Sequence, residues 1–308
     1  MSLFEKLENF LFQTPVWKLI LFLFLIMLFK TGIFYHPNLH YHLDVAKNPY
    51  TNFFENEGNL DLFYMSYFGS WLAQFIGATS KMSFFLFHLV FSVSFSFLFI
   101  KIIFKNFSNE IARISLILFF VFPASSTIYY IVGYDSVTIF LMALTLYFKS
   151  YIYLTFLIGI LMGMQHFELS FFGSGALLLS MVIAVIIKVK SKSSILFPLS
   201  VFAGVIIGRI ILNYIFEYNN MNISTERSQW YAESLPEVLY SFFFHFYDII
   251  WFSLGLGWII IFKFYISSDK KIYFLIPFFC MLAMLPIIPD TTRTFSVMSF
   301  LLIAYVIL

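Results

Sequence analysis

The sequence has little charge and almost no cysteine, and each shortage excludes a class of protein. Charged residues make up 11% of the 308 positions, whereas hydrophobic residues make up 61%. A soluble fold of this composition would have too little polar surface to face water, so the bilayer must be the main solvent. The single cysteine, Cys280, excludes an intrachain disulfide.

Several catalytic and binding motifs are also missing. The chain has no Gly-rich phosphate loop, nucleophile elbow, CxxC pair or zinc-protease helix. Its basic residues lie in short loops without an accompanying domain, so nothing supports binding to nucleic acid. We assign no cofactor and no metal ligand from the sequence.

Apolar runs long enough to cross a bilayer recur along the whole chain, so residues 1–308 form a single transmembrane domain. The sequence predicts an all-α polytopic membrane protein of about nine or ten transmembrane helices, the first a retained signal anchor. Residues 63–76 are predicted to form a re-entrant or interfacial helix after that first span. The candidate spans are 17–34, 82–104, 114–131, 136–148, 151–164, 171–187, 195–216, 240–262, 272–288 and 295–308.

Basic residues indicate the orientation of these spans. A cytoplasmic N-terminus puts about two thirds of the Lys and Arg residues on the inner side, as the positive-inside rule expects. The acidic residues then gather on the outer side. Two large external connections follow from this topology, at 35–81 and 217–239.

Short polar insertions stand at three outer helix ends, at 133–135, 165–168 and 290–293. A charge near hydrocarbon costs on the order of 3 kcal/mol, so such residues usually face a wet cavity or a partner. Structural ion pairs and interfacial caps explain any one of them equally well, but the group favours function. The candidate substrate-binding residues in these insertions are Asp135, His166, Glu168, Asp290 and Arg293.

Arg209 is the charged residue that most needs a partner, because it falls inside an apolar span. Gly204 and Gly208 precede it with the small-xxx-small spacing that lets a neighbouring helix approach closely. We expect Arg209 to pair with Asp248, Glu168 or Asp290, since an unpaired charge there would be costly.

The first external connection carries three of the six histidines, at positions 36, 40 and 42. Asp44 or Asp61 in this connection can act as a general base, although an ordinary solvated loop is the plainer interpretation. In an extended backbone His40, His42 and Asp44 would share one face and could bind a metal, but a histidine hydrogen-bonded to Asp44 is favoured. His88 and His245 are expected to be hydrogen-bonded core histidines.

The second connection places Arg227 beside Trp230 and Tyr231. An arginine next to aromatic rings suits a phosphate and a sugar. The same residues suit a membrane-interface belt, where Trp and Tyr are enriched whatever the function.

This organisation resembles the C-type (GT-C) glycosyltransferases and the O-antigen polymerases. The features that carry the resemblance are the single N-terminal helix, the long external loop with Asp44 ahead of the Asn48-Pro49-Tyr50 turn, and the segment PASSTIYYIVGYD at 123–135. The resemblance implies a polyprenyl-phosphate-linked saccharide as substrate and a first-loop carboxylate that activates the acceptor. That carboxylate maps best onto Asp44 and second best onto Asp61, although Val45 departs from an acidic pair.

The expected function is therefore glycosyl transfer or repeat-unit polymerisation in cell-surface polysaccharide synthesis, at the outer face of a bacterial inner membrane. Arg209, Arg227 or Arg293 would neutralise the phosphate leaving group. The alternative is a transporter or flippase of a polar or lipid-linked substrate, supported by the charges of Arg209 and Asp248. An assembly subunit without chemistry is the third alternative.

Overall fold

The computed structural model describes residues 3–52, 54, 63–64, 66–221, 223, 228–267, 271–287 and 291–307. Their regular structure is helical, apart from one isolated parallel bridge between Tyr35 and Val132. The helices are α1 Leu3–Gln13, α2 Val16–Thr31, α3 Leu39–Lys47, α4 Tyr67–Phe75, α5 Lys81–Asn106, α6 Asn109–Val121, α7 Pro123–Tyr130, α8 Tyr134–Tyr147, α9 Ile152–Gln165, α10 Phe167–Ile186, η2 Lys192–Ile195, α11 Leu196–Tyr218, α12 Ser228–Phe244, α13 Phe246–Leu254, α14 Gly257–Ser267, α15 Ile272–Leu282, η3 Leu285–Ile287 and α16 Thr291–Ile307.

Three helices in the described part of the chain are long and apolar enough to cross a membrane: Lys81–Asn106, Phe167–Ile186 and Lys192–Tyr218. The pair α6 and α7 is bent by 48° and makes a fourth if it is one span. Further apolar helices, among them α8, α9 and α15, are shorter. The prediction of an all-α polytopic membrane protein is confirmed, and the number of nine or ten spans stays a prediction.

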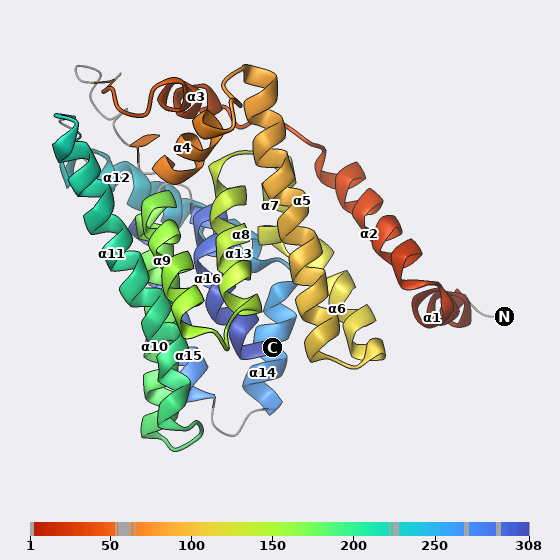
Figure 1. Ribbon diagram of the computed structural model, residues 1–308. Helices are drawn as coiled ribbons and strands as arrows, with labels where there is room; N and C mark the ends of the chain where they lie inside the picture. The colour runs from red at the N-terminus through yellow and green to blue at the C-terminus, as the bar shows by residue number, and fades with distance from the viewer. Residues whose placement is uncertain are drawn as a thin grey trace.

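The helix α16 lies in the middle of the bundle. Every residue from Phe295 to Ala304 is buried, and the helix packs against α7, α8, α10, α13 and α15. Its first turn lies toward the upper end of the bundle in Figure 1 and carries Arg293. The position of this one helix therefore places an arginine among several neighbouring helices.

The helices α9 and α11 pack at very short range through four glycines. A Cβ atom on Gly159 would lie 2.6 Å from the carbonyl oxygen of Val201, and one on Gly163 would overlap the carbonyl oxygen of Val205. Gly204 and Gly208 are in the same position opposite the backbone of α9. The predicted close approach at Gly204 and Gly208 is confirmed, since small residues let two helix backbones touch.

The two ends of the bundle differ in chemistry. The connections from α5 to α6, α8 to α9 and α10 to α11 lie at the lower end in Figure 1. Lysines gather near them: Lys101 and Lys105 in α5, Lys149 between α8 and α9, and Lys188, Lys190 and Lys192 between α10 and α11. There, burial and the neighbouring charges of Lys105 and Lys190 lower the pKa of Lys149. At the upper end lie α3 and α4, which contact each other and which we call the cap.

The cap includes the short helix that the sequence predicts at 63–76. Within that segment α4 has nine residues, a length of about 13 Å, against a hydrocarbon core of about 30 Å. The helix is therefore too short to cross the membrane, in agreement with the prediction.

The predicted span 240–262 is wrong as one continuous helix. The chain breaks at His245, between α12 and α13, and again between α13 and α14 at Gly255. Gly255 has a φ of +53°, a conformation that ends a right-handed helix and that residues with a side chain rarely adopt. Apolar composition alone does not reveal such breaks, because all three pieces are hydrophobic.

The glycine contact between α9 and α11 yields a stability prediction. Changing Gly208 to Ala places a Cβ atom against the backbone of Ile160, so the two helices must separate. We expect a loss of about 1–3 kcal/mol, the usual range for overpacking, measured as a lower unfolding temperature in detergent. Gly175→Ala is the matched control, because the new Cβ meets only the Phe202 side chain, at 3.3 Å. An equal loss in both variants would contradict the close-packing explanation.

Candidate functional site

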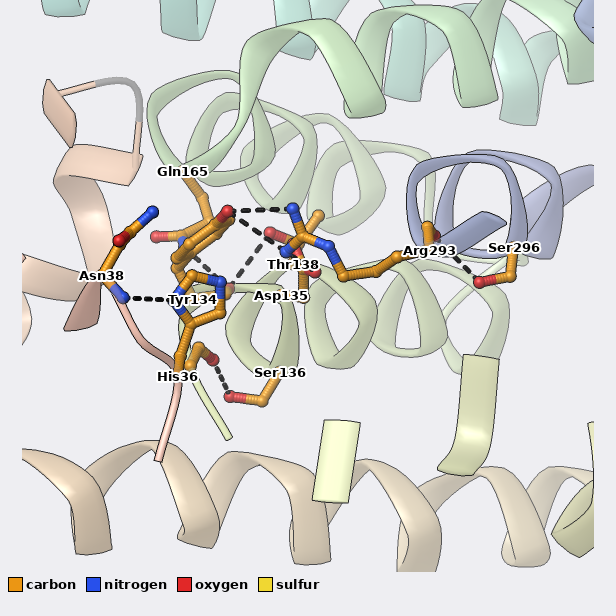
Figure 2. A network of polar contacts seen from close by, with 10 residues as sticks. His36, Asn38, Tyr134, Asp135, Ser136, Thr138, Gln165, Arg293 and Ser296 are labelled. Atoms are coloured by element: carbon orange, nitrogen blue, oxygen red, sulfur yellow. Dashed lines mark hydrogen bonds and ion pairs between the residues drawn. The ribbon is translucent and has the colours of Figure 1, made fainter. Parts of the chain in front are cut away.

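An ion pair between Arg293 and Asp135 forms the centre of the candidate site. Nη1 of Arg293, in the first turn of α16, donates to Oδ2 of Asp135, in the first turn of α8, at 2.6 Å. The two side chains are only 16% and 6% exposed. Both terminal nitrogens of Arg293 also donate to the Tyr134 hydroxyl, each at 3.1 Å. Figure 2 shows the guanidinium group facing Tyr134 and Asp135 together.

The ring of Tyr134 is surrounded by histidines. Its centroid lies 4.5 Å from that of His42, 5.1 Å from that of His36 and 6.0 Å from that of His166. These histidines come from the cap helix α3, from the segment before it and from the junction of α9 and α10. Two distant parts of the sequence, the first loop and the junction of α9 and α10, therefore meet at one tyrosine.

Backbone contacts hold the first loop against the start of α8. The amide of Val132 donates to the carbonyl of Phe34 at 2.9 Å, and the amide of His36 donates to the carbonyl of Val132 at 3.2 Å. A Cβ atom on Gly133 would lie 3.1 Å from Cβ of His36. The glycine thus lets the imidazole lie close to Tyr134.

Gln165 joins the cap to the same site. Its Oε1 accepts from the amide of Gly69 in α4 at 2.6 Å, and its Nε2 donates to the carbonyl of Tyr134 at 3.1 Å. Gln165 is fully buried. One side chain on α9 therefore fixes both α4 and the first turn of α8.

Burial keeps His36 and His42 neutral at neutral pH. Burial and the charge of Arg293 lower the pKa of His36 from 6.5 to about 4. Burial lowers the pKa of His42 well below its ordinary value, and His36, His88 and His166 add to the effect. Nδ1 of His36 accepts from the amide of Asn38 at 3.1 Å, so the ring proton of the neutral form is on Nε2.

His42 differs from His36 in its hydrogen bonding. Neither ring nitrogen makes a hydrogen bond of normal geometry within the described residues, although the backbone of Phe63 lies beside the ring. Its side chain is 2% exposed. A buried polar ring of this kind is available to donate to, or accept from, a bound molecule.

The structure brings together only some of the residues predicted from sequence. Asp135, His166 and Arg293 meet at Tyr134. Arg209 and Glu168 form a second group, in which the guanidinium lies 5.5 Å from the Phe167 ring and interacts with the Glu168 charge. Of the expected partners of Arg209 that the structure describes, Glu168 is the one whose charge acts on it. Three predicted residues lie outside the described part of the chain: Asp61, Arg227 and Asp290.

The extended arrangement considered for His40, His42 and Asp44 does not occur, because these residues lie in the helix α3. Positions two apart in a helix point about 200° away from each other. His42 faces Tyr134, whereas Asp44 is ion-paired with Lys47 at 2.8 Å. The favoured hydrogen bond from a histidine to Asp44 is absent from the described residues. Asp44 instead lies near Tyr35, and burial of Tyr35 together with the negative charge of Asp44 raises the pKa of Tyr35.

The two histidines expected in the core behave differently. His88 is 1% exposed and lies edge-on to Phe84 and Phe87. It is a core residue, but its ring nitrogens make no hydrogen bond of normal geometry within the described residues, and only the backbone of Gly133 lies beside them. His245 is exposed and lies 3.9 Å from Asp248, so its predicted core position is wrong.

Sequence reasoning missed the role of Tyr134 as the centre of the site. Tyrosine is common in this chain, with 19 copies, so its identity alone carries little information. The available signal was its place between Gly133 and Asp135 at a helix start. In the described residues no three His, Cys, Asp or Glu side chains are placed to hold a metal ion.

No protein-family model, no curated protein and no solved structure matches the chain. The fold and the site define an all-α polytopic membrane protein. Its distinguishing feature is a buried arginine–aspartate pair under a helical cap, with histidine rings gathered around an adjoining tyrosine.

The ion pair yields a prediction about stability. Arg293→Met leaves the Asp135 carboxylate buried without its countercharge, and we expect a loss of about 3–5 kcal/mol in the free energy of unfolding. Removing both charges, in Arg293→Met with Asp135→Asn, should recover most of that loss. Denaturant titration of the two single variants and the double variant measures the coupling. Strictly additive losses would show that the two side chains do not stabilise each other.

The low pKa of His36 yields a prediction about pH. Between pH 6.5 and about 4 the unfolded chain binds a proton at this position that the folded chain does not, so stability falls as the pH is lowered. At about 1.36 kcal/mol per pH unit, this interval corresponds to a loss of about 3 kcal/mol. His36→Gln should remove that part of the loss in unfolding titrations at pH 7 and pH 4. His40→Gln, on the exposed side of α3, serves as the control and should keep the wild-type loss.

Proposed function

We propose that the protein is a membrane glycosyltransferase or repeat-unit polymerase that acts on a polyprenyl-phosphate-linked saccharide at the end of the bundle covered by the cap. The observation that carries the proposal is the Arg293 cluster. A guanidinium group is oriented there by Asp135 and Tyr134 beneath polar loop residues. Such preorganised charge suits a phosphate that becomes a leaving group.

The neutral histidines support the same proposal. A neutral imidazole can donate from one nitrogen and accept at the other, as hydroxyl and phosphate groups require. His36 and His42 both lie against Tyr134, which contacts Arg293. The histidines therefore add hydrogen-bonding groups beside the arginine without adding a competing charge.

Asp44 is the proposed general base. Its carboxylate is 39% exposed, on a different face of the cap helix α3 from His42, and Nζ of Lys47 donates to it at 2.8 Å. In the proposed step the carboxylate takes the proton of the acceptor hydroxyl as that oxygen attacks the anomeric carbon. The bond from the sugar to the phosphate breaks, and Arg293 neutralises the departing polyprenyl phosphate.

A transporter is the weaker candidate, because the two charged residues that favoured it, Arg209 and Asp248, interact with different partners. Asp248 is 64% exposed and lies beside His245. Arg209 interacts instead with Glu168. These side chains do not mark one path through the bundle in the described residues.

The test compares two exposed aspartates. Asp44 and Asp248 each have a basic partner three residues away, but only Asp44 belongs to the cap. In the native host, a strain lacking the protein is complemented with the wild type, Asp44→Asn or Asp248→Asn, and the cell-surface glycan is profiled. We expect Asp44→Asn to lower transfer by about 10²–10⁴-fold, the usual contribution of a general base, and Asp248→Asn to restore the profile.

Membrane levels of all three proteins are compared by immunoblot, so that a folding defect is not mistaken for lost chemistry. A full glycan from the Asp44→Asn strain at equal protein level would remove Asp44 from the reaction. A glycan that does not change even when the protein is deleted would refute glycosyl transfer altogether.

A further inference from the structure

A cleft of about 630 Å³ is lined by residues of the cap helix α4 and of α9 and α11, near the ends of α9 and α11 that lie beside the cap. This volume lies within the range of about 300–1,000 Å³ that is usual for small-molecule sites. Phe68 and Trp71 line it from α4, and Tyr214 and Tyr218 line it from α11. The rings on each side are stacked with one another, at 6.4 Å and 6.3 Å between centroids.

Neutral polar groups accompany these aromatic rings. Tyr50 lines the cleft, and its hydroxyl accepts a hydrogen bond from Nε1 of Trp71 at 2.9 Å. Asn219 also lines it, and its Nδ2 donates to the carbonyl of Ile215 at 2.7 Å. The described lining residues include no charged side chain. A phosphate or another ionic group would therefore find no countercharge here.

Tyr67 lines the same cleft and carries the strongest sign of a ligand. The residue is only 1% exposed, and its hydroxyl has no hydrogen-bond partner among the described residues. The hydroxyls of Tyr50 and Tyr64 are close enough to affect it electrostatically, and after burial they raise the pKa of Tyr67. A buried hydroxyl without a partner is rare in folded proteins and calls for an explanation.

We propose that this cleft binds a neutral saccharide. Sugar rings combine apolar C–H faces, which pack on the negative faces of aromatic rings, with hydroxyls that donate and accept hydrogen bonds. The cleft offers both, because aromatic rings line it together with the neutral polar side chains of Tyr50, Tyr67 and Asn219. A lipid chain would fill the aromatic walls equally well, but it would leave the Tyr67 hydroxyl without a partner.

The cleft adjoins the Arg293 site through adjacent residues. Met164 lines the cleft, whereas its neighbour Gln165 donates to the backbone of Tyr134. In α4, Phe68 likewise lines the cleft while Gly69 binds Gln165. The choice of a saccharide rests on the proposed function, and the cleft would hold the neutral sugars of a chain whose phosphate lies at Arg293. Binding at the cleft can nevertheless be measured without catalysis.

The experiment uses the full-length protein in phospholipid nanodiscs, because alkyl-maltoside detergents carry sugars of their own. Saturation-transfer NMR detects binding of a panel of neutral oligosaccharides built from glucose, galactose, mannose, rhamnose and N-acetylglucosamine. For the saccharide that binds, we expect Tyr67→Phe to weaken the affinity about tenfold through the lost hydrogen bond. Tyr218→Leu should weaken it at least about threefold through the lost ring face.

Two controls separate binding from folding. Tyr247→Leu removes an equally exposed tyrosine, 79% against 76% for Tyr218, from a helix outside the cleft, and it should bind as the wild type does. Tyr67→Phe should keep the wild-type unfolding temperature without ligand, since its hydroxyl makes no internal hydrogen bond among the described residues. A lowered unfolding temperature with unchanged affinity would make Tyr67 structural and overturn the proposal.

A second measurement tests the lipid alternative. In a variant that keeps Trp71 as its only tryptophan, phospholipids with brominated acyl chains quench the fluorescence if hydrocarbon fills the cleft. Strong quenching that no saccharide relieves would overturn the proposal, as would failure of the whole panel to bind. Saccharide binding in a protein whose deletion leaves the cell-surface glycan unchanged would refute the proposed transferase and leave the cleft assignment standing.

Discussion

A buried arginine at the start of a central helix is the constraint on which the upper end of this protein depends. The side chain of Arg293 is only 16% exposed, so an unpaired charge there would cost several kcal/mol. Asp135 supplies the opposite charge from the first turn of α8. The pair therefore fixes how α16 meets α8, and it orients Tyr134, the residue before Asp135, toward the same guanidinium.

The cap follows from that arrangement. Once Tyr134 is in place, its ring and backbone receive groups from distant segments: His36 and His42 pack on the ring, and Gln165 binds the carbonyl while holding α4 through Gly69. Burial then makes the two histidines neutral at neutral pH. The contacts that hold the cap against the bundle thus also create a polar environment, in which the positive charge of Arg293 is balanced by the carboxylate of Asp135.

Close packing at glycines has a different effect on the other side of the cap. Gly159, Gly163, Gly204 and Gly208 bring the backbones of α9 and α11 together. The ends of these two helices beside the cap, together with α4, then enclose an aromatic cleft near the arginine site. A charged site and a neutral aromatic cleft therefore share α4 and α9 as common walls, which is the arrangement that a phosphate-linked saccharide would require.

The sequence by itself determined the class of fold, because apolar runs of membrane length and scarce charge leave a chain no stable alternative to helices in a bilayer. It also showed the close helix contact at Gly204 and Gly208, and three of the residues that meet at the site. Only the tertiary structure decided that Asp135 pairs with Arg293, a residue 158 positions away. It also decided that Asp44 and His42 lie on different faces of α3 and that Arg209 interacts with Glu168. Hydrophobic pattern is a local property of the chain, whereas the partner of a buried charge depends on which helices become neighbours.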